Sequence, residues 1–294
     1  MKIALSGYRG FIGSALEKEL VHNGNEVIRL GRDALYDYKG KFLREKLAGV
    51  DAVVHVAGAP ILTRWTRKNR EIIFNSRVKT TQNLISAIRM IPKAEQPRIF
   101  ISASAVGIYE SGIEHTEEST RYAGHFASQV TAAWEEASAS LSPEIRRVVF
   151  RIGVVIDRNS QMIKQLRLPF KLGLGGPIGT GKQPMPFIHL QDVTGAINWA
   201  LENDSTRGVY NLTAPEITDN HTFSRLLARC YHRPAWIRVP GFLLVLIFGK
   251  AAQLVLDSPA VVPARLLRDG YTFRFPVLEA ALREITGTKN NPGT

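Results

Sequence analysis

Three glycines near the N-terminus have a spacing that suits a dinucleotide-binding loop. Residues 7–13 read GYRGFIG, a G-x-x-G-x-x-G pattern, between an apolar run at Lys2–Ser6 and a helical pattern at Phe11–His22. Glycine here permits a tight turn and lets the backbone approach a pyrophosphate, while N–H groups at the helix N-terminus attract phosphate oxygens. The placement between a strand and a helix favours cofactor binding over a purely structural turn.

The end of the second expected strand, Glu26–Leu30, is where dinucleotide-binding folds distinguish NAD from NADP. An acidic residue there would bind the ribose 2′-hydroxyl and repel a 2′-phosphate. This chain has Gly31 and then Arg32, whose guanidinium can pair with a phosphate through two hydrogen bonds. Asp33 follows at once and weakens the argument, and the alternative is that Arg32 is an ordinary surface residue. We expect NADP.

A second glycine-rich run, at 176–183, nearly matches the P-loop pattern G-x-x-x-x-G-K-[ST]. Its last position is Gln183, which has no hydroxyl for Mg²⁺, and Pro184 opposes the helix that must follow. We therefore expect no P-loop, although Lys182 and Gln183 remain candidate contacts to an anionic substrate. The histidines have no metal-ligand spacing and Cys230 is the only cysteine, so we expect no metal site and no internal disulfide.

The elements that would hold these loops alternate between short apolar runs and helical patterns. We expect strands at 2–6, 26–30, 51–56, 98–102, 147–152 and 209–212, and helices at 11–22, 67–90, 125–141 and 191–202. This alternation indicates an α/β fold, a parallel sheet with helices on both faces. Beyond about residue 156 the pattern loosens. Residues 172–186 suggest a loop, and short helices at 222–232, 241–256 and 277–286 suggest a smaller α-rich C-terminal domain.

Composition and charge fit one or two globular domains. The chain has 294 residues, 45% hydrophobic and 22% charged, which argues against a disordered, fibrous or disulfide-stapled protein. Of the net charge of +12, residues 1–100 carry +9, with 18 basic against 9 acidic residues. This excess favours anionic partners, with a solvated basic face as the alternative. With no signal peptide or membrane-spanning run evident, we expect a cytoplasmic monomer or homodimer without membrane partners.

Several motifs together resemble the extended short-chain dehydrogenases/reductases. Besides the glycine loop, these are HVAG at 55–58, SASAVGIY at 102–109, RIG at 151–153 and FIHLQD at 187–192. More narrowly, GAPI at 58–61, RWT at 64–66, WE at 134–135 and LGLGGPIGTGKQ at 172–183 are similar to the atypical, epimerase-like branch. Its members are described as nucleotide-sugar epimerase-like or as NADP-dependent oxidoreductases. That branch ends in a small domain of unknown function, which residues 240–286 resemble.

The resemblance implies a Rossmann-type, doubly wound parallel sheet with NADP along its C-terminal edge. It implies an NADP-binding domain at 1–165, to which 187–215 return, and a small substrate-side domain formed by 166–186 and 216–294. His189 and Asp192 would link the strand and loop that frame the cleft. The residues that we assign to the cofactor are Gly7, Arg9, Gly10, Phe11, Ile12, Arg32, Ala57, Gly58, Ala59, Arg77, Ser102, Ile152 and Gly153.

The same resemblance reveals a departure in the proton-transfer residues. In the wider family a Tyr exchanges a proton with the substrate oxygen, a Lys four residues later lowers the Tyr pKa, and a Ser binds the same oxygen. Ser104 matches that serine, with Ser102 as the alternative. No Tyr in this chain has a Lys four positions on, and no Lys occurs from 94 to 163. Tyr109 is our candidate for the missing group. The other candidates are Glu117, Glu118, Tyr122 and His125.

We therefore expect an NADP-dependent oxidoreductase or a nucleotide-sugar epimerase-like enzyme that acts on a small anionic substrate, free or nucleotide-linked. The missing Tyr and Lys leave open a catalytically weak NADP-binding sensor or scaffold. RNA binding is the least favoured alternative. Residues 64–98 carry nine basic and two acidic residues, but Trp65 and Phe74 are the only aromatic residues there that could stack on bases.

Overall fold

Six parallel strands form the central sheet, in the order β2-β1-β3-β4-β6-β9. The structure, a computed structural model, describes residues 1–288. The strands are β1 (Lys2–Ser6), β2 (Glu26–Leu30), β3 (Ala52–His55), β4 (Ile99–Ala105), β6 (Arg146–Ile152) and β9 (Gly208–Leu212). The order reverses between β1 and β3, because the chain runs from β1 outward to β2 and then returns to β3. Parallel sheets of this kind bind ligands at such a switch point, outside the carboxyl ends of the strands.

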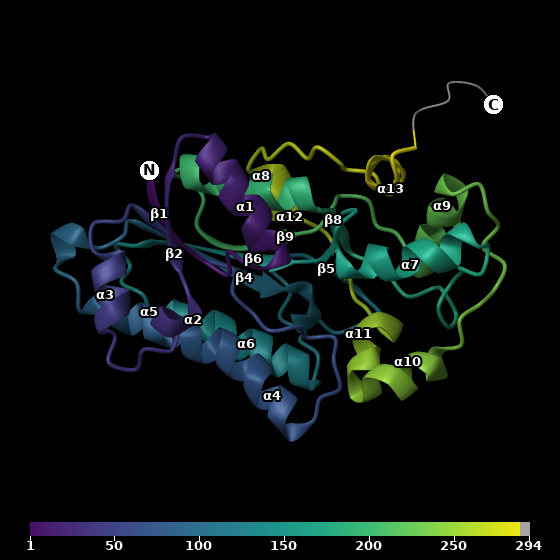
Figure 1. Ribbon diagram of the computed structural model, residues 1–294, viewed down its shortest axis with the longest axis horizontal. Helices are drawn as coiled ribbons and strands as arrows, with labels where there is room; N and C mark the ends of the chain where they lie inside the picture. Colours follow the sequence, from purple (N-terminus) through teal and green to yellow (C-terminus); the bar gives the residue numbers. More distant parts are fainter. Residues whose placement is uncertain (289–294) are drawn as a thin grey trace.

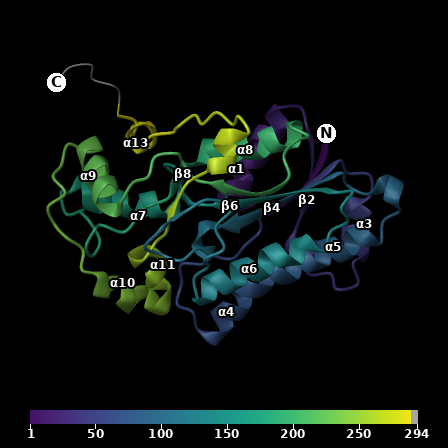
Figure 2. The same cartoon turned by 180° about the vertical axis from the view of Figure 1, so that it is seen from behind.

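Helices cover both faces of the sheet (Figures 1 and 2). One face carries α1 (Phe11–His22), α8 (Leu190–Glu202) and α12 (Ala264–Arg268). The other carries α2 (Arg32–Leu35), α3 (Lys41–Leu47), α4 (Arg67–Phe74), α5 (Thr80–Arg89) and α6 (Phe126–Ala139). The doubly wound α/β sheet expected from the sequence is confirmed.

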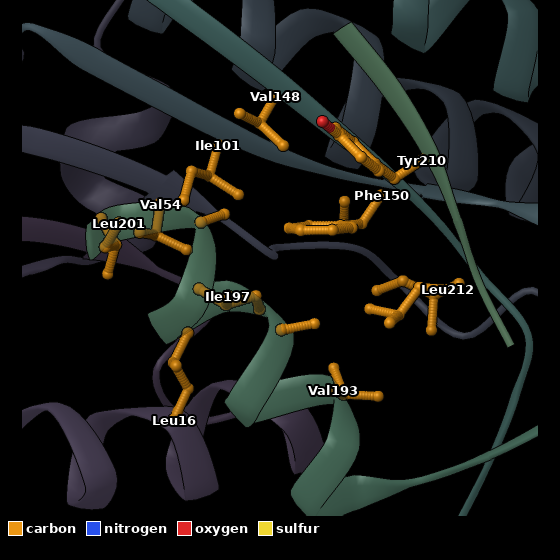
Figure 3. Packing of buried hydrophobic residues seen from close by; sticks show 14 of the residues in the cluster. Leu16, Val54, Ile101, Val148, Phe150, Val193, Ile197, Leu201, Tyr210 and Leu212 are labelled. Carbon is orange, nitrogen blue, oxygen red and sulfur yellow. The ribbon is translucent and has the colours of Figure 1, made fainter. Parts of the chain in front are cut away.

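Alternate strand residues face the two helical layers, because successive side chains of a strand point to opposite sides. Val54 belongs to the core beneath α1 and α8, whereas Val53 belongs to the core shared with α3 and α5. Figure 3 shows Val54 beside Leu201 of α8, with Ile197 of α8 and Leu16 of α1 in the same cluster. The strands are therefore fixed from both sides, which holds the loops at their carboxyl ends in place.

The C-terminal part adds a helical region beside the sheet. Helices α7 (Gln161–Lys171), α9 (Asn220–Cys230) and α13 (Leu278–Thr286) share a core that includes Phe170, Leu227 and Leu282. Two short strand pairs, β7 (Val154–Ile156) with β8 (Phe187–His189) and β5 (Glu114–His115) with β10 (Ala260–Val261), complete the fold. Among residues 1–288, no helix has both the length and the apolar character needed to span a membrane.

Two of the predicted helices are interrupted in the structure. The helix expected at 67–90 is a continuous run, but a π-helical stretch, Asn75–Lys79, separates α4 from α5. The helix expected at 241–256 is broken, because Gly249 takes φ +58°. It divides into α10 (Gly241–Phe248), a 3₁₀ turn (Gly249–Ala252) and α11 (Gln253–Leu256). Shorter 3₁₀ turns occur at Lys93–Glu95 and Val106–Ile108.

Candidate functional site

A cleft of about 540 Å³ opens at the carboxyl ends of β1, β3, β4 and β6, beside the switch point. This volume is typical of small-ligand sites. The predicted residues that line it are Gly10, Phe11, Ile12, Gly58, Ala59, Arg77, Ser104, Ile152 and Gly153. Lining residues that were not predicted include Thr131 and Trp134 on α6, and Leu254, Asp257, Ser258 and Pro259 in and after α11.

The glycine loop packs so closely against its neighbours that side chains are excluded. Gly7 has φ +76°, and a Cβ there would lie 2.8 Å from the backbone nitrogen of Ala57. A Cβ on Gly13 would lie 2.1 Å from the carbonyl oxygen of Gly7. The Gly10 N–H donates a 2.8 Å hydrogen bond to that oxygen, and α1 begins at the next residue without a side-chain cap. The first N–H groups of α1 are therefore suited to bind phosphate oxygens.

Two arginines follow the carboxyl ends of adjacent strands. The last residues of β1 and β2, Ser6 and Leu30, are register partners. Arg9 and Arg32 each follow within three residues of these strand ends, so both lie at the same edge of the sheet. Both are exposed, and neither takes part in an ion pair within residues 1–288. They do not line the enclosed part of the cleft. Their charge is available beside the glycine loop, and their role as cofactor contacts stays a prediction.

Arg77 brings a positive charge into the cleft wall. Its guanidinium donates hydrogen bonds to the carbonyl oxygens of Ala59 (2.9 Å) and Ile73 (3.3 Å) and lies over the ring of Trp134, 5.4 Å from its centre. Burial lowers the pKa of Arg77 to about 10. Within residues 1–288 no carboxylate pairs with it. The indole N–H of Trp134 is buried without a hydrogen-bond partner. Both groups suit a polar, anionic ligand.

Ser104, Glu135 and Arg151 form a hydrogen-bonded chain at the inner wall of the cleft. Ser104 Oγ donates to Glu135 Oε1 at 2.5 Å. Arg151, the register partner of Ser104 on β6, donates to both oxygens of that carboxylate at 2.8 Å. Burial alone would lower the pKa of Arg151, but the hydrogen bonds and charge of Glu135 raise it above its ordinary value. Ser104 is 4% exposed and lines the cleft, so it connects the largely buried Glu135 carboxylate, 12% exposed, with the ligand space.

Tyr109 lies outside the cleft lining. It is 1% exposed, and its hydroxyl lies 2.8 Å from Asn211 Oδ1 and accepts a hydrogen bond from Arg151 at 2.7 Å. Burial raises the pKa of this hydroxyl. The alternative Tyr122 also sits against Arg151, at 3.2 Å. This arrangement favours a structural role for Tyr109, so the catalytic role predicted for it finds no support in its position.

His125 is the one alternative candidate that reaches the cleft. Its Nδ1 accepts a hydrogen bond from the Ser128 N–H at 3.1 Å and so caps α6. Burial lowers the pKa of His125, which keeps the ring neutral at pH 7 with its proton assigned to Nε2. The next cleft-lining positions of α6, Ala127, Val130 and Thr131, carry no acid or base. The part of α6 that lines the cleft at Ala127, Val130 and Thr131 therefore supplies neither a Tyr nor a Lys.

The remaining predicted residues are not in the cleft lining. Ser102 is 1% exposed and donates to the Ala103 carbonyl oxygen, and Ala57 packs under Gly7. Lys182 is exposed, and Gln183 donates to the Ile178 carbonyl oxygen at 3.0 Å. Glu117 accepts hydrogen bonds from the backbone N–H groups of Asn211 and Arg265, and Glu118 is exposed.

His189 and Asp192 join the C-terminal segment to the sheet layer. His189 Nε2 lies 3.1 Å from Glu284 Oε2, and Asp192 accepts hydrogen bonds from the backbone N–H groups of Arg274 and Phe275. Asp157, His189 and Glu284 bring ligand atoms within 4.8 Å of one another. Because Arg158 forms an ion pair with the Glu284 carboxylate and His189 hydrogen-bonds to it, this cluster is best described as a contact that holds α13.

The chain is similar to known proteins along its whole length. Residues 3–213 match the model of the NAD dependent epimerase/dehydratase family, and residues 239–285 match DUF1731, a domain of unknown function. The mouse epimerase family protein SDR39U1 is 36% identical over 97% of this chain and 99% of its own length. The Bacillus subtilis epimerase family protein YfhF is 32% identical over 97% and 98%. The epimerase-like resemblance drawn from the motifs is confirmed.

Solved structures share the fold. The crystal structure of human epimerase family protein SDR39U1 (isoform 2) with NADPH superposes with a TM-score of 0.89 at 33% identity, covering 98% of this chain and all of that one. A nucleoside-diphosphate sugar epimerase from Corynebacterium glutamicum gives a TM-score of 0.78 at 27% identity, covering 98% of this chain and 58% of its own. The UDP-N-acetylglucosamine 4-epimerase of Bacillus cereus, at 18% identity and a TM-score of 0.74, shares the fold.

Proposed function

Because the chain belongs to the NAD dependent epimerase/dehydratase family, we propose that it binds NADPH and acts as an oxidoreductase on a small substrate. One observation carries the proposal. The glycine loop lies at the strand switch point, where Gly10 lines the cleft and α1 begins without a side-chain cap. The Arg77 guanidinium, which has no carboxylate partner within residues 1–288, lies in the wall of the same cleft. When bound, NADPH supplies hydride-transfer chemistry, and the protein supplies binding, orientation and proton transfer.

The cleft suits this cofactor in several independent ways. Side chains at Gly7 or Gly13 would collide with backbone atoms, so this tight turn needs glycine at both positions. Because no side chain caps α1, the first N–H groups of that helix can bind a pyrophosphate. In our proposal Arg32 binds the 2′-phosphate, with Arg9 beside it. The unpartnered Trp134 N–H and the Arg77 guanidinium would gain acceptors from a bound ligand. The human relative crystallised with NADPH adds support from outside this chain.

Ser104 and Glu135 supply the proton path in this proposal. Because the Ser104 hydroxyl donates to Glu135, its oxygen is left to accept a hydrogen bond from a substrate hydroxyl. In alcohol oxidation the substrate hydroxyl proton would pass to Ser104 as the Ser104 proton passes to Glu135. Carbonyl reduction reverses both transfers. Arg151 orients the carboxylate, and His125 Nε2–H is a further donor at the cleft wall.

The class of the substrate is proposed from the family, because the cofactor would itself fill much of the cleft of about 540 Å³. We propose a small molecule, free or nucleotide-linked. The predicted anionic character depended on Lys182 and Gln183, which lie outside the cleft lining, so we leave the charge of the substrate open. With a single, half-buried cysteine, Cys230, a reducing compartment such as the cytoplasm suits the chain, and we retain that assignment as a proposal.

A second candidate function is NADPH binding without efficient turnover. It is favoured by the α6 segment at 126–131, where cleft-lining side chains carry no acid or base. Turnover separates the two candidates. Purified protein should oxidise NADPH when supplied with a panel of small carbonyl compounds and 4-keto nucleotide sugars, and Ser104→Ala should lower that activity by about 100-fold or more. Tight NADPH binding with no turnover on any member of the panel would favour the sensor or scaffold.

A further inference from the structure

Helix α10 is apolar on every side and none of its residues is buried. Its sequence is GFLLVLIF, and five of its side chains form a surface that we name the apolar patch. Their exposed fractions are 67% for Phe242, 37% for Leu243, 50% for Val245, 66% for Leu246 and 58% for Ile247. Helices of globular domains normally bury their apolar stripe, and a continuous exposed patch marks an interaction surface.

The patch is held rigidly at one side of the molecule. Phe248, at the end of α10, packs against a small core that contains Trp65 and Ala251. Arg64 donates hydrogen bonds to the carbonyl oxygens of Leu246 and Ile247, which satisfies the C-terminal end of the helix. Both ribbon views place α10 on the same side of the sheet as α4, at the margin of the molecule (Figures 1 and 2). The patch therefore projects from a fixed support.

Positive charge surrounds the patch. Residues 220–256 contain no Asp or Glu, but they contain Arg225, Arg229, Arg233, Arg238 and Lys250. Arg238 precedes α10 and Lys250 follows it, and both are exposed, as is Arg64. In the part of the chain that the structure describes, none of these three cations has an ion-pair partner. The acids that flank this segment are Asp219, which caps α9, and Asp257, which lines the cofactor cleft.

The same segment, residues 220–256, also forms a hollow lined by arginines. A hollow of about 480 Å³ is lined by Arg225 and Arg229 on one face of α9, together with Arg233 and Trp236. Trp236 is 86% exposed, only a few residues before α10. Exposed Trp beside cations and an apolar helix is the composition of segments that bind at the membrane–water interface.

We infer that the apolar patch docks on an anionic lipid bilayer. The five apolar side chains would enter the acyl boundary, and Arg64, Arg238 and Lys250 would lie among lipid phosphates, which complement their charge. An eight-residue helix is far too short to span the bilayer, so the contact is peripheral. Self-association through this patch is disfavoured, because a twofold contact would bring the same unpaired cations of two copies together.

Such docking would also orient the cofactor cleft. The chain passes from α10 through the 3₁₀ turn at Gly249–Ala252 into α11, and Leu254 and Asp257 line the cleft. One wall of the cleft is thus continuous with the lipid-facing helix, and it would lie close to the bilayer surface.

Vesicle co-sedimentation of the full-length protein tests this inference. We expect binding to vesicles of phosphatidylcholine with phosphatidylglycerol, and binding at least about tenfold weaker to phosphatidylcholine alone. Leu246→Glu should weaken binding by at least about tenfold, because it puts a charge in the acyl boundary. Val21→Glu, at a position 56% exposed on α1 across the sheet, is the matched control and should bind as the unchanged protein does. Lipids brominated in the acyl chain should quench Trp236 emission.

Three outcomes would overturn the inference. The first is no sedimentation with either vesicle, when circular dichroism shows folded protein. The second is equal loss of binding in Leu246→Glu and Val21→Glu. The third is a dimer that analytical ultracentrifugation detects without lipid and that Leu246→Glu dissociates. This result would make the apolar patch an interface between two copies of the chain. Substitution of Arg238 and Lys250 by Ala should weaken binding to anionic vesicles alone, by about fivefold per residue.

Discussion

Ser104 Oγ on β4 donates a 2.5 Å hydrogen bond to Glu135 Oε1 on α6. The two residues are 31 positions apart and meet because α6 packs across the ends of β4 and β6. Since Arg151 holds both oxygens of the same carboxylate, the direction of the Ser104 hydroxyl is fixed. The cleft lacks the Tyr and Lys that are usual in the family. It still contains the Ser104 hydroxyl, which a hydrogen bond to the largely buried Glu135 carboxylate orients.

The proton path predicts a specific pattern of kinetic losses. Ser104→Ala should lower kcat by about 100-fold or more, the range of lost general acid–base catalysis, and Glu135→Gln by at least about tenfold. The double variant should lose little more than Ser104→Ala, because the two groups act in series. Steady-state kinetics on the best substrate, with NADPH affinity measured separately, checks this. The control Glu136→Gln, at an exposed position on the same helix, should leave kcat unchanged. Losses in kcat from Ser104→Ala and Glu135→Gln that add fully in the double variant would contradict the proton path.

The choice of cofactor is predicted to depend on Arg32. Replacing it with Ala removes a charge-assisted phosphate contact, so NADPH affinity should fall about tenfold or more while NADH affinity stays the same. Fluorescence titration with both nucleotides measures the ratio. Arg44→Ala, an exposed arginine on α3, is the matched control. An equal loss of affinity for NADPH and NADH in Arg32→Ala would mean that Arg32 does not contact the 2′-phosphate.

Tyr109 is predicted to stabilise the fold without taking part in the reaction. Tyr109→Phe leaves Asn211 and Arg151 short of a buried partner, so the free energy of unfolding should fall by about 1–3 kcal/mol. Because the hydroxyl does not line the cleft, kcat should change less than about twofold. Denaturant unfolding and steady-state kinetics on one preparation check both. A large loss of kcat at unchanged stability would restore Tyr109 as a catalytic candidate.

Acid should destabilise the protein through His55. Complete burial lowers the pKa of His55 to about 3, whereas in an unfolded chain it is about 6.5. Between these values the unfolded chain binds a proton that the folded one does not. The contribution of His55 is therefore fully present above pH 6.5 and is lost as the pH falls, by about 1.4 kcal/mol per pH unit. Unfolding of His55→Gln across this range should show a shallower slope than the unchanged protein or the exposed control His22→Gln. Equal slopes would refute it.

Local sequence signals predicted the main sheet and the glycine loop well. Strands β1 and β2 and helix α1 have the expected bounds, because Gly7, Gly10 and Gly24 mark the turns around them. Helix α7 was missed, since Pro169 lies within its last turn and argues against a helix when read alone. The break at Gly249 was likewise invisible, because glycine is tolerated in a helical pattern and only the backbone conformation reveals the turn.

Contacts between side chains that are far apart in the sequence could not be predicted from the sequence. Ser104 was predicted from a motif, but the pairing of Glu135 with Arg151 depends on how α6 crosses two strands. The cleft wall formed by Asp257 and Ser258 comes from chain far from the glycine loop and carries no local signal. Lys182 shows the converse error. Its charge and glycine-rich surroundings suggested a ligand contact, but Lys182 lies outside the cleft lining.

Direct titration of NADPH into the purified protein tests the central claim, that the glycine-loop cleft is an NADPH site. Calorimetry should give one site per chain with a Kd of about 1–10 µM, in the range usual for enzyme ligands, and NADH should bind at least about tenfold more weakly. The bound complex should also melt at a higher temperature, because the ligand binds only the folded state. No heat and no shift with either nucleotide, up to about 1 mM, would contradict the account.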